Sequence, residues 1–111
     1  MRSARVAQAA IVLAAALGAA CGAPISGVAV ETLWAEHCAA CHGEDGRGVR
    51  ARRTLEPWLD LARSPMIARR DRGLIFQRIA YGYAAMPGFA HKLPRGDIEK
   101  LVELAVRLAG R

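Results

Sequence analysis

Aromatic side chains are scarce in this chain of 111 residues, which holds two each of Trp, Tyr and Phe. Hydrophobic residues still make up 53% of the sequence, so any core must be built mainly from small and aliphatic side chains. A chain of this length has room for one small domain. Domains this small bury little surface per residue, and a disulfide, a metal or a bound group usually adds stability. We therefore expect a covalent staple or a bound group.

Base-stacking aromatics are absent from the two arginine-rich runs of the chain, RGVRARR and ARRDR. Proteins that bind single-stranded nucleic acid combine positive charge with aromatic side chains on which the bases stack. The sequence therefore argues against a nucleic-acid partner. We interpret the two runs as a solvated basic surface.

Cysteine is also rare, because the chain has only Cys21, Cys38 and Cys41. A structural zinc site needs four ligands, and the single histidines His37 and His91 do not supply the missing second pair. A thioredoxin-type dithiol expects its cysteines at a helix N-terminus after a strand, whereas the close pair here follows a predicted helix. Zinc, a redox disulfide and a structural disulfide remain as alternatives that the spacing does not favour.

The first 20 residues have the layout of a secretory signal. Arg2 and Arg5 precede the uncharged run VAQAAIVLAAALGAA, and cleavage is expected after Ala20. This run has 15 residues, fewer than the roughly 20 that span a bilayer, although an uncleaved membrane anchor stays open as an alternative. Cys21 stands where a bacterial lipoprotein signal places its acylated cysteine, so lipidation is a second route to a membrane tether. We expect an exported, periplasmic protein.

The predicted organisation has three parts: a secretory signal at 1–20, a short linker at 21–27 and one domain at 28–111.

Three helices are predicted from apolar residues that recur at steps of three and four. The first covers about 28–40 and brings both cysteines of the close pair onto one face. The second runs from Asp71, a favourable N-cap residue, to about Tyr81. The third has Asp97 as its N-cap and runs to Gly110. No segment alternates apolar and polar residues as a half-buried strand does, so the predicted class is all-α.

A long loop separates the first two predicted helices, and one short helical turn is expected in it at Ser64-Pro65. Loops of this length are uncommon in small domains. We expect the loop to wrap a bound group that supplies the missing core.

The run Cys38-Ala39-Ala40-Cys41-His42 has the pattern C-x-x-C-H, the signature of covalent haem attachment. Two cysteines three positions apart on a helical turn can form thioethers with the two vinyl groups of one porphyrin. The next residue, His42, then projects its imidazole toward the iron. Because this attachment takes place outside the cytoplasm, it agrees with the leader. The sequence predicts one haem c and its iron, bonded to Cys38 and Cys41 and ligated by His42.

A sixth iron ligand is predicted at Met86, within the segment AAMPGF. Proline disfavours helical geometry at the residue before it, so Met86 is expected in an extended loop that can carry its sulfur across a haem face. Most methionines are pliable core fillers, and His91, Met66 or an open site stay as alternatives.

These residues resemble class I cytochrome c over about 28–109, from the helix that enters CAACHG to the closing C-terminal helix. The resemblance implies a small cytochrome c fold in which three main helices wrap one haem. It also implies that the first and last helices cross, with Trp34 at the usual aromatic position and Leu104 where the last helix often has an aromatic residue. A loop proline carbonyl is expected to accept a hydrogen bond from His42, which points to Pro57.

The resemblance further implies one-electron transfer, with iron cycling between Fe(II) and Fe(III), and no enzymatic reaction of the chain's own. We expect a free or membrane-tethered shuttle. The alternatives are a dedicated haem subunit of an exported dehydrogenase or terminal oxidase, and a haem-based gas sensor with a displaceable Met86. Without residues 1–20 the chain has 14 basic and 10 acidic side chains, which predicts protein redox partners with an acidic docking face.

Overall fold

The computed structural model describes residues 22–111, which form short helices around one long helix. The predicted secretory signal at 1–20 and the predicted lipidation site Cys21 lie outside the described residues. Within residues 22–111, no helix combines the length and the apolar character that crossing a bilayer requires.

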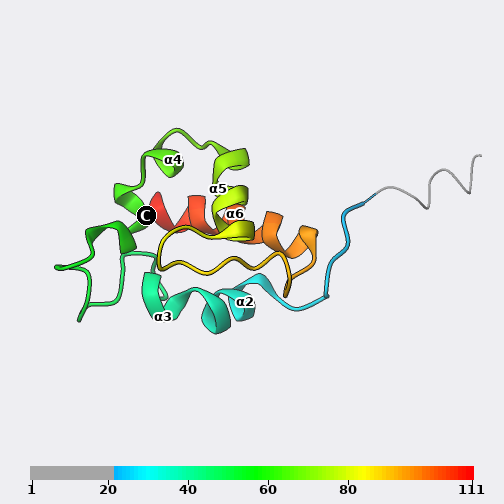
Figure 1. Cartoon of the computed structure of the whole chain (residues 1–111), viewed down its shortest axis with the longest axis horizontal. Coiled ribbons are helices and arrows are strands. Elements are labelled where there is room, and N and C mark those ends of the chain that lie inside the picture. The colour runs from blue at the N-terminus through cyan, green and yellow to red at the C-terminus, as the bar shows by residue number, and fades with distance from the viewer. Residues whose placement is uncertain (1–21) are drawn as a thin grey trace, which may run out of the picture.

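Five α-helices and two 3-10 turns make up the secondary structure of this part of the chain (Figure 1). In chain order they are α2 Val30–His37, α3 Ala39–His42, η1 Pro57–Leu59, η2 Leu61–Arg63, α4 Pro65–Ala68, α5 Arg72–Tyr81 and α6 Arg95–Ala109. Between residues 22 and 111 the β-type pairing is limited to one isolated bridge, from Tyr83 to Met86. The predicted all-α class is confirmed.

Helix α6 forms the centre of the fold because its apolar residues recur at three- and four-residue steps and face inward. Leu101 and Ile98 are among the most deeply buried side chains of the described residues. Helices α2 and α5 both pack against α6, and in Figure 1 α5 crosses α6 while α2 lies below it. The expected contact between the first and last helices is present, since Trp34 and Leu104 belong to one buried cluster.

The predicted N-cap of this last helix is wrong. Helix α6 begins at Arg95, two residues before the predicted start, because Pro94 is still extended at ψ 154° and marks the boundary. Asp97 therefore lies inside the first turn. Its carboxylate accepts hydrogen bonds from Ser26 in place of the amides of its own helix.

The predicted helix at 28–40 is divided into α2 and α3, which meet at Cys38 (φ −121°, ψ −40°). The break places the cysteine motif on a short turn of its own. Gly43, with φ 73°, ends that turn, and its carbonyl accepts a hydrogen bond from the indole Nε1 of Trp34 at 2.9 Å. A positive φ of this size favours glycine. The buried Trp34 thus fixes the end of the motif against the core.

The second predicted helix is confirmed as α5, whose N-cap Asp71 accepts a hydrogen bond from the amide of Leu74. Gly82, with φ 74°, ends it as expected. The predicted turn at Ser64-Pro65 is confirmed as α4, where the Ser64 hydroxyl accepts from the amide of Ile67. In each case a short polar side chain satisfies an amide that the helix leaves free.

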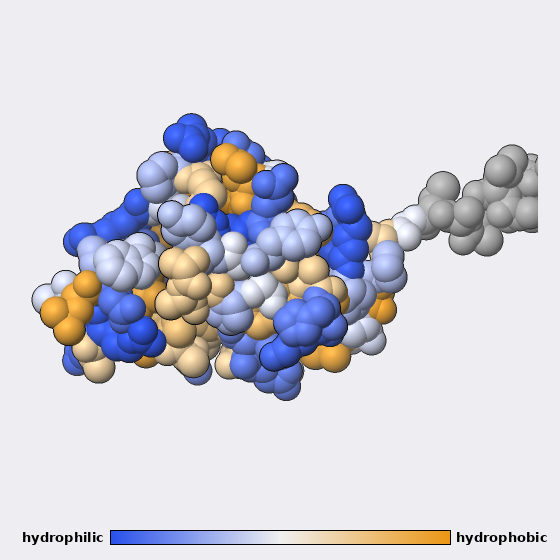
Figure 2. Space-filling model, viewed as in Figure 1, coloured by the Kyte–Doolittle hydropathy of each residue, from blue (hydrophilic) through white to orange (hydrophobic). Residues whose placement is uncertain are grey.

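The surface of the domain is mixed in character. Figure 2 shows hydrophilic residues over much of one face, with separate hydrophobic areas between them. Leu55 and Trp58 are the large apolar side chains of the long loop that stay exposed, at 81% and 66%.

Candidate functional site

Cys38, Cys41 and His42 lie on one turn of helix. The amide of His42 donates to the Cys38 carbonyl at 2.9 Å, and the amide of Cys41 donates to the same carbonyl at 3.2 Å. All three side chains are half-buried, and neither cysteine is in a disulfide within the described residues. The backbone therefore presents two thiols and an imidazole from a single short segment.

Burial raises the pKa of the Cys38 thiol to about 11, and the neighbouring Cys41 adds to the rise. Desolvation disfavours the thiolate because the charged form loses its hydration. As long as Cys38 carries a free thiol, it is protonated at neutral pH.

The His42 ring is held by its Nδ1 atom, which lies 2.8 Å from the carbonyl oxygen of Leu59. A carbonyl can only accept, so Nδ1 carries the proton and donates. In the neutral imidazole the other ring nitrogen, Nε2, then keeps its lone pair, the form in which imidazole binds a metal. The Trp34 ring, with its centroid 6.1 Å from that of His42, packs beside it.

The structure corrects the role expected for Pro57. Its carbonyl lies on the 3-10 turn η1 and accepts from the amide of Asp60 at 3.2 Å. The turn carries the chain two residues further before a carbonyl faces His42, and that carbonyl belongs to Leu59. The sequence holds no signal for this choice, because any residue can supply a backbone carbonyl.

Met86 lies outside any helix, as predicted, in a tight turn closed by two hydrogen bonds between Tyr83 and Met86, at 3.0 and 2.9 Å. Ala84 in this turn has φ 49°, a left-handed conformation that is rare for a residue with a side chain. The Met86 side chain is half-buried and packs against the core cluster. The turn therefore fixes the backbone from which the Met86 side chain leaves.

Two glycines bring the Met86 loop close to the end of α5. A Cβ at Gly88 would lie 2.7 Å from the backbone carbon of Tyr81, and one at Gly82 would lie 2.8 Å from the amide nitrogen of Gly88. Neither contact is compatible with a side chain. The loop then continues along the helix end, where the amide of Phe89 donates to the Ile79 carbonyl at 3.0 Å.

Phe89 also links this loop to the cysteine motif. Its buried ring lies 5.5 Å, between centroids, from the ring of His37, the residue before Cys38. Phe89 of the methionine loop thus packs against the residue that directly precedes the C-x-x-C-H turn. His37 is half-buried beside the motif, as expected.

The long loop 43–64 is bonded directly to the motif. The amide of Gly48 donates to the His42 carbonyl at 2.7 Å, and the amide of Val49 donates to the Cys41 carbonyl at 3.0 Å. Further along, Arg52 lies beside Cys41, with Nη1 3.7 Å from Sγ. The sequence gives no sign of this contact, because Arg52 is one of several arginines in a basic run.

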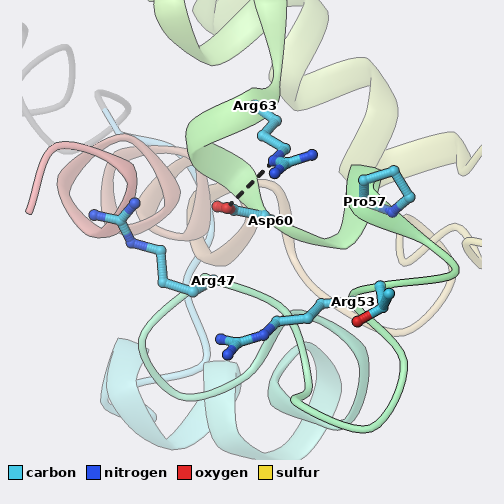
Figure 3. Close-up of a pocket in the computed structure, with 6 residues that line it drawn as sticks. Arg47, Arg53, Pro57, Asp60 and Arg63 are labelled. Carbon is cyan, nitrogen blue, oxygen red and sulfur yellow. Dashed lines mark ion pairs between the residues drawn. The ribbon is translucent and has the colours of Figure 1, made fainter.

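Side chains of the same loop surround a basic hollow of about 640 Å³ (Figure 3). It is lined by Arg47, Arg53, Thr54, Pro57, Asp60 and Arg63. Asp60 and Arg63 face each other at 3.9 Å, and three arginines against one aspartate leave the lining positively charged. Because Pro57 and Asp60 flank Leu59, the hollow lies next to the segment that holds His42.

The donor set fits a covalent haem. Two thiols on one turn can each form a thioether, an imidazole with an unprotonated Nε2 can donate a nitrogen lone pair to a metal, and the thioether of a loop methionine is a sulfur donor. Histidine and methionine are the axial pair found in cytochromes c. The residues present therefore match the group that the sequence predicts.

Residues 27–104 match a family model described as "Cytochrome C oxidase, cbb3-type, subunit III". The match covers most of the chain, including the cysteine motif, Leu59 and Met86. A search of curated proteins finds no match.

Proposed function

Because this chain belongs to the cbb3-type cytochrome c family, with covalent haem c and iron, we propose that it is an exported carrier of single electrons. In this proposal Cys38 and Cys41 would hold the haem by thioether bonds, and His42 and Met86 would be the protein ligands of its iron. The single observation that carries it is the His42 geometry, in which Nδ1 donates to Leu59 and Nε2 is left to bind iron.

When bound, the haem supplies an iron that takes up and releases one electron. The chain's own residues set the conditions for that exchange. The Leu59 carbonyl fixes the His42 ring and makes Nε2 a better donor. The turn at Tyr83 and the close approach of Gly82 and Gly88 hold the backbone of the loop that carries Met86. As a neutral ligand, the Met86 thioether would favour Fe(II) and would raise the reduction potential.

Two roles are compatible with this chemistry. A shuttle reacts with separate partners in turn, whereas a haem subunit stays docked on a catalytic chain. The description of the matching family favours the subunit of a terminal oxidase, and the exposed Leu55 and Trp58 are side chains that a permanent partner would cover. The basic hollow favours brief encounters, since charged surfaces mainly raise association rates.

The basic hollow is the surface we assign to an acidic redox partner. Its three arginines, Arg47, Arg53 and Arg63, lie beside the segment that holds His42. The rate of electron transfer to such a partner should fall as salt rises, because ions screen exposed charges within about 8 Å at physiological ionic strength. A rate that does not depend on salt would contradict this assignment.

Export and a membrane tether are part of the proposal. They depend on the sequence pattern of 1–20 and on Cys21. Expression of the full chain with and without Cys21→Ser, followed by fractionation, tests them. Haem protein that moves from the membrane to the periplasmic fraction in the variant supports lipidation of Cys21, and an unchanged distribution contradicts it.

Absorption spectra of the protein, matured in a host that attaches haem, test the ligand set. Replacing both Cys38 and Cys41 by alanine should abolish covalent haem on a denaturing gel. Met86→Ala should remove the near-infrared sulfur-to-iron band of the oxidised form. Met66→Ala is the matched control, because Met66 is also half-buried against the core and should keep the band. Loss of the band in the Met66 variant alone would overturn the assignment of Met86.

Blue-native gels of detergent-solubilised membranes separate the two roles. A haem-stained band that migrates with oxidase activity identifies a docked subunit. Haem that migrates only at the mass of this chain identifies a shuttle.

A further inference from the structure

Arg52 is anchored on both sides of its guanidinium. Nε donates to Glu56 Oε2 at 2.6 Å and Nη2 donates to Oε1 at 3.0 Å, a two-point pairing with one carboxylate. The remaining nitrogen, Nη1, lies 3.7 Å from Cys41 Sγ. Arg52 thus bridges an acidic side chain and the sulfur that is proposed to bear the haem.

The backbone holds this arrangement in place. The amide of Glu56 donates to the Arg52 carbonyl at 2.9 Å, and that of Arg52 donates to the Val49 carbonyl at 3.0 Å. Val49 is itself bonded to the Cys41 carbonyl. The turn that carries Arg52 is therefore attached to the cysteine motif, so the contact with Cys41 Sγ does not depend on the side chain alone.

The guanidinium keeps its charge. The hydrogen bonds to Glu56 raise the pKa of Arg52 above its ordinary value, and the charge of Glu56 adds to the rise. Arginine is protonated in proteins in any case. The positive end of the Arg52–Glu56 pair faces Cys41, while the negative end faces away from it.

We propose that Arg52 acts on the haem through its charge and raises the reduction potential of this cytochrome. The inference rests on the proposed attachment of haem at Cys41. Oxidation of Fe(II) to Fe(III) adds one positive charge to the haem as the electron leaves for the partner. Because the guanidinium, and not the Glu56 carboxylate, contacts the Cys41 sulfur, the positive end of the pair opposes that step and stabilises Fe(II). Arg52 is thus a positioning and tuning residue, and it does not ligate the iron.

Arg52→Gln should lower the midpoint potential of the holoprotein. At a fixed poise near the wild-type midpoint, the Fe(II)/Fe(III) ratio should fall roughly threefold, because the charge is partly exposed to solvent. Arg52→Lys should restore most of the ratio, since it keeps the charge but not the two-point pairing. Arg50→Gln is the matched control, as Arg50 is an exposed arginine of the same loop without a contact to either cysteine.

Spectroelectrochemical titration of the four proteins measures the effect, with the reduced and oxidised spectra as a check on ligation. The inference is supported if the midpoint potential falls more in Arg52→Gln than in Arg50→Gln and recovers in Arg52→Lys. Equal shifts in the Arg52→Gln and Arg50→Gln variants overturn it, and so does a lysine variant that matches the glutamine one. If the proposed function itself is wrong, the wild-type protein carries no covalent haem, and this outcome is distinct from any shift in potential among the variants.

Discussion

Ser26 is bound to Asp97, 71 positions later in the chain, by two hydrogen bonds to one carboxylate. The Ser26 amide donates to Oδ1 at 3.1 Å, and its hydroxyl donates to Oδ2 at 2.5 Å. Asp97 is fully buried, and beside it the Pro24 carbonyl accepts from the amide of Gly96 at 2.8 Å. The segment predicted as a linker at 21–27 is therefore attached to the start of α6, and Figure 1 shows it leaving the domain at that end.

Loss of this contact should destabilise the domain. Asp97→Ala leaves the Ser26 hydroxyl and amide without their acceptor, and we expect it to lower the free energy of unfolding by about 2–3 kcal/mol. Ser26→Ala removes one donor and should cost about 1–2 kcal/mol. Urea unfolding of the holoprotein, followed by absorbance, measures both. Glu99→Gln, an exposed change on the same helix, should stay within about 0.5 kcal/mol. Equal losses in the free energy of unfolding for Ser26→Ala and Glu99→Gln would show that Ser26 does not hold the segment 21–27 on the domain.

Gly88→Ala should disturb the Met86 loop, because its new Cβ would meet the backbone of Ala80 and Tyr81 at 2.8 and 2.7 Å. We expect a loss of at least about 2 kcal/mol in stability, and weakening of the sulfur-to-iron band. Gly73→Ala is the control, since a Cβ there has Asp71 Oδ1 at 3.7 Å as its near neighbour and Gly73 lies in helix α5. Alanine is favoured over glycine in helices by about 1 kcal/mol. Gly73→Ala should therefore be neutral or stabilising, and a band unaffected by Gly88→Ala would contradict the prediction.

Pro57 and Leu59 should respond differently to replacement by alanine. Pro57 is half-buried and its carbonyl serves η1, so Pro57→Ala should change stability by less than about 1 kcal/mol. Leu59 is 7% exposed and carries the carbonyl that accepts from His42. Leu59→Ala should cost about 2–4 kcal/mol and loosen that hydrogen bond. The Nδ1 proton of His42, observed by ¹⁵N NMR of the reduced protein, should exchange faster in Leu59→Ala than in Pro57→Ala. Faster exchange of this proton in Pro57→Ala than in Leu59→Ala would show that Pro57, and not Leu59, supports the hydrogen bond of His42.

The ion pair between Arg72 and Glu103, which joins α5 to α6 at 2.5 Å, should stabilise the domain only above acidic pH. Hydrogen bonding to Arg72 lowers the pKa of Glu103 below its ordinary value. Because the folded carboxyl is the stronger acid, the stabilisation is complete above the ordinary glutamate pKa of about 4.3 and is lost as the pH falls through the lowered pKa.

Melting temperatures of wild type and Glu103→Gln should therefore differ slightly at pH 7 and converge at pH 3. The effect is small because both side chains are half exposed. Glu44→Gln, a change at an exposed glutamate of the long loop, serves as the control and should show no such convergence. If the melting temperatures of wild type and Glu103→Gln differ as much at pH 3 as at pH 7, the stabilisation does not depend on the ionisation of Glu103.

The sequence alone was sufficient where the chemistry is local. Asp71 and Ser64 cap helices because a short polar side chain reaches an amide three residues ahead. Pro87 keeps Met86 out of a helix for an equally local reason. The C-x-x-C-H pattern predicted the cofactor because five adjacent positions carry the whole signature, and the family match agrees with it.

Contacts between distant segments were decided only by the tertiary structure. The carbonyl that holds His42 belongs to Leu59 and not to Pro57, because the geometry of η1 selects one carbonyl among several that are chemically identical. Asp97 serves Ser26 and not its own helix, and Arg52 reaches Cys41 across a folded loop. A backbone carbonyl or a single charged side chain has no sequence signature of its partner, because that partner is fixed only when the chain has packed.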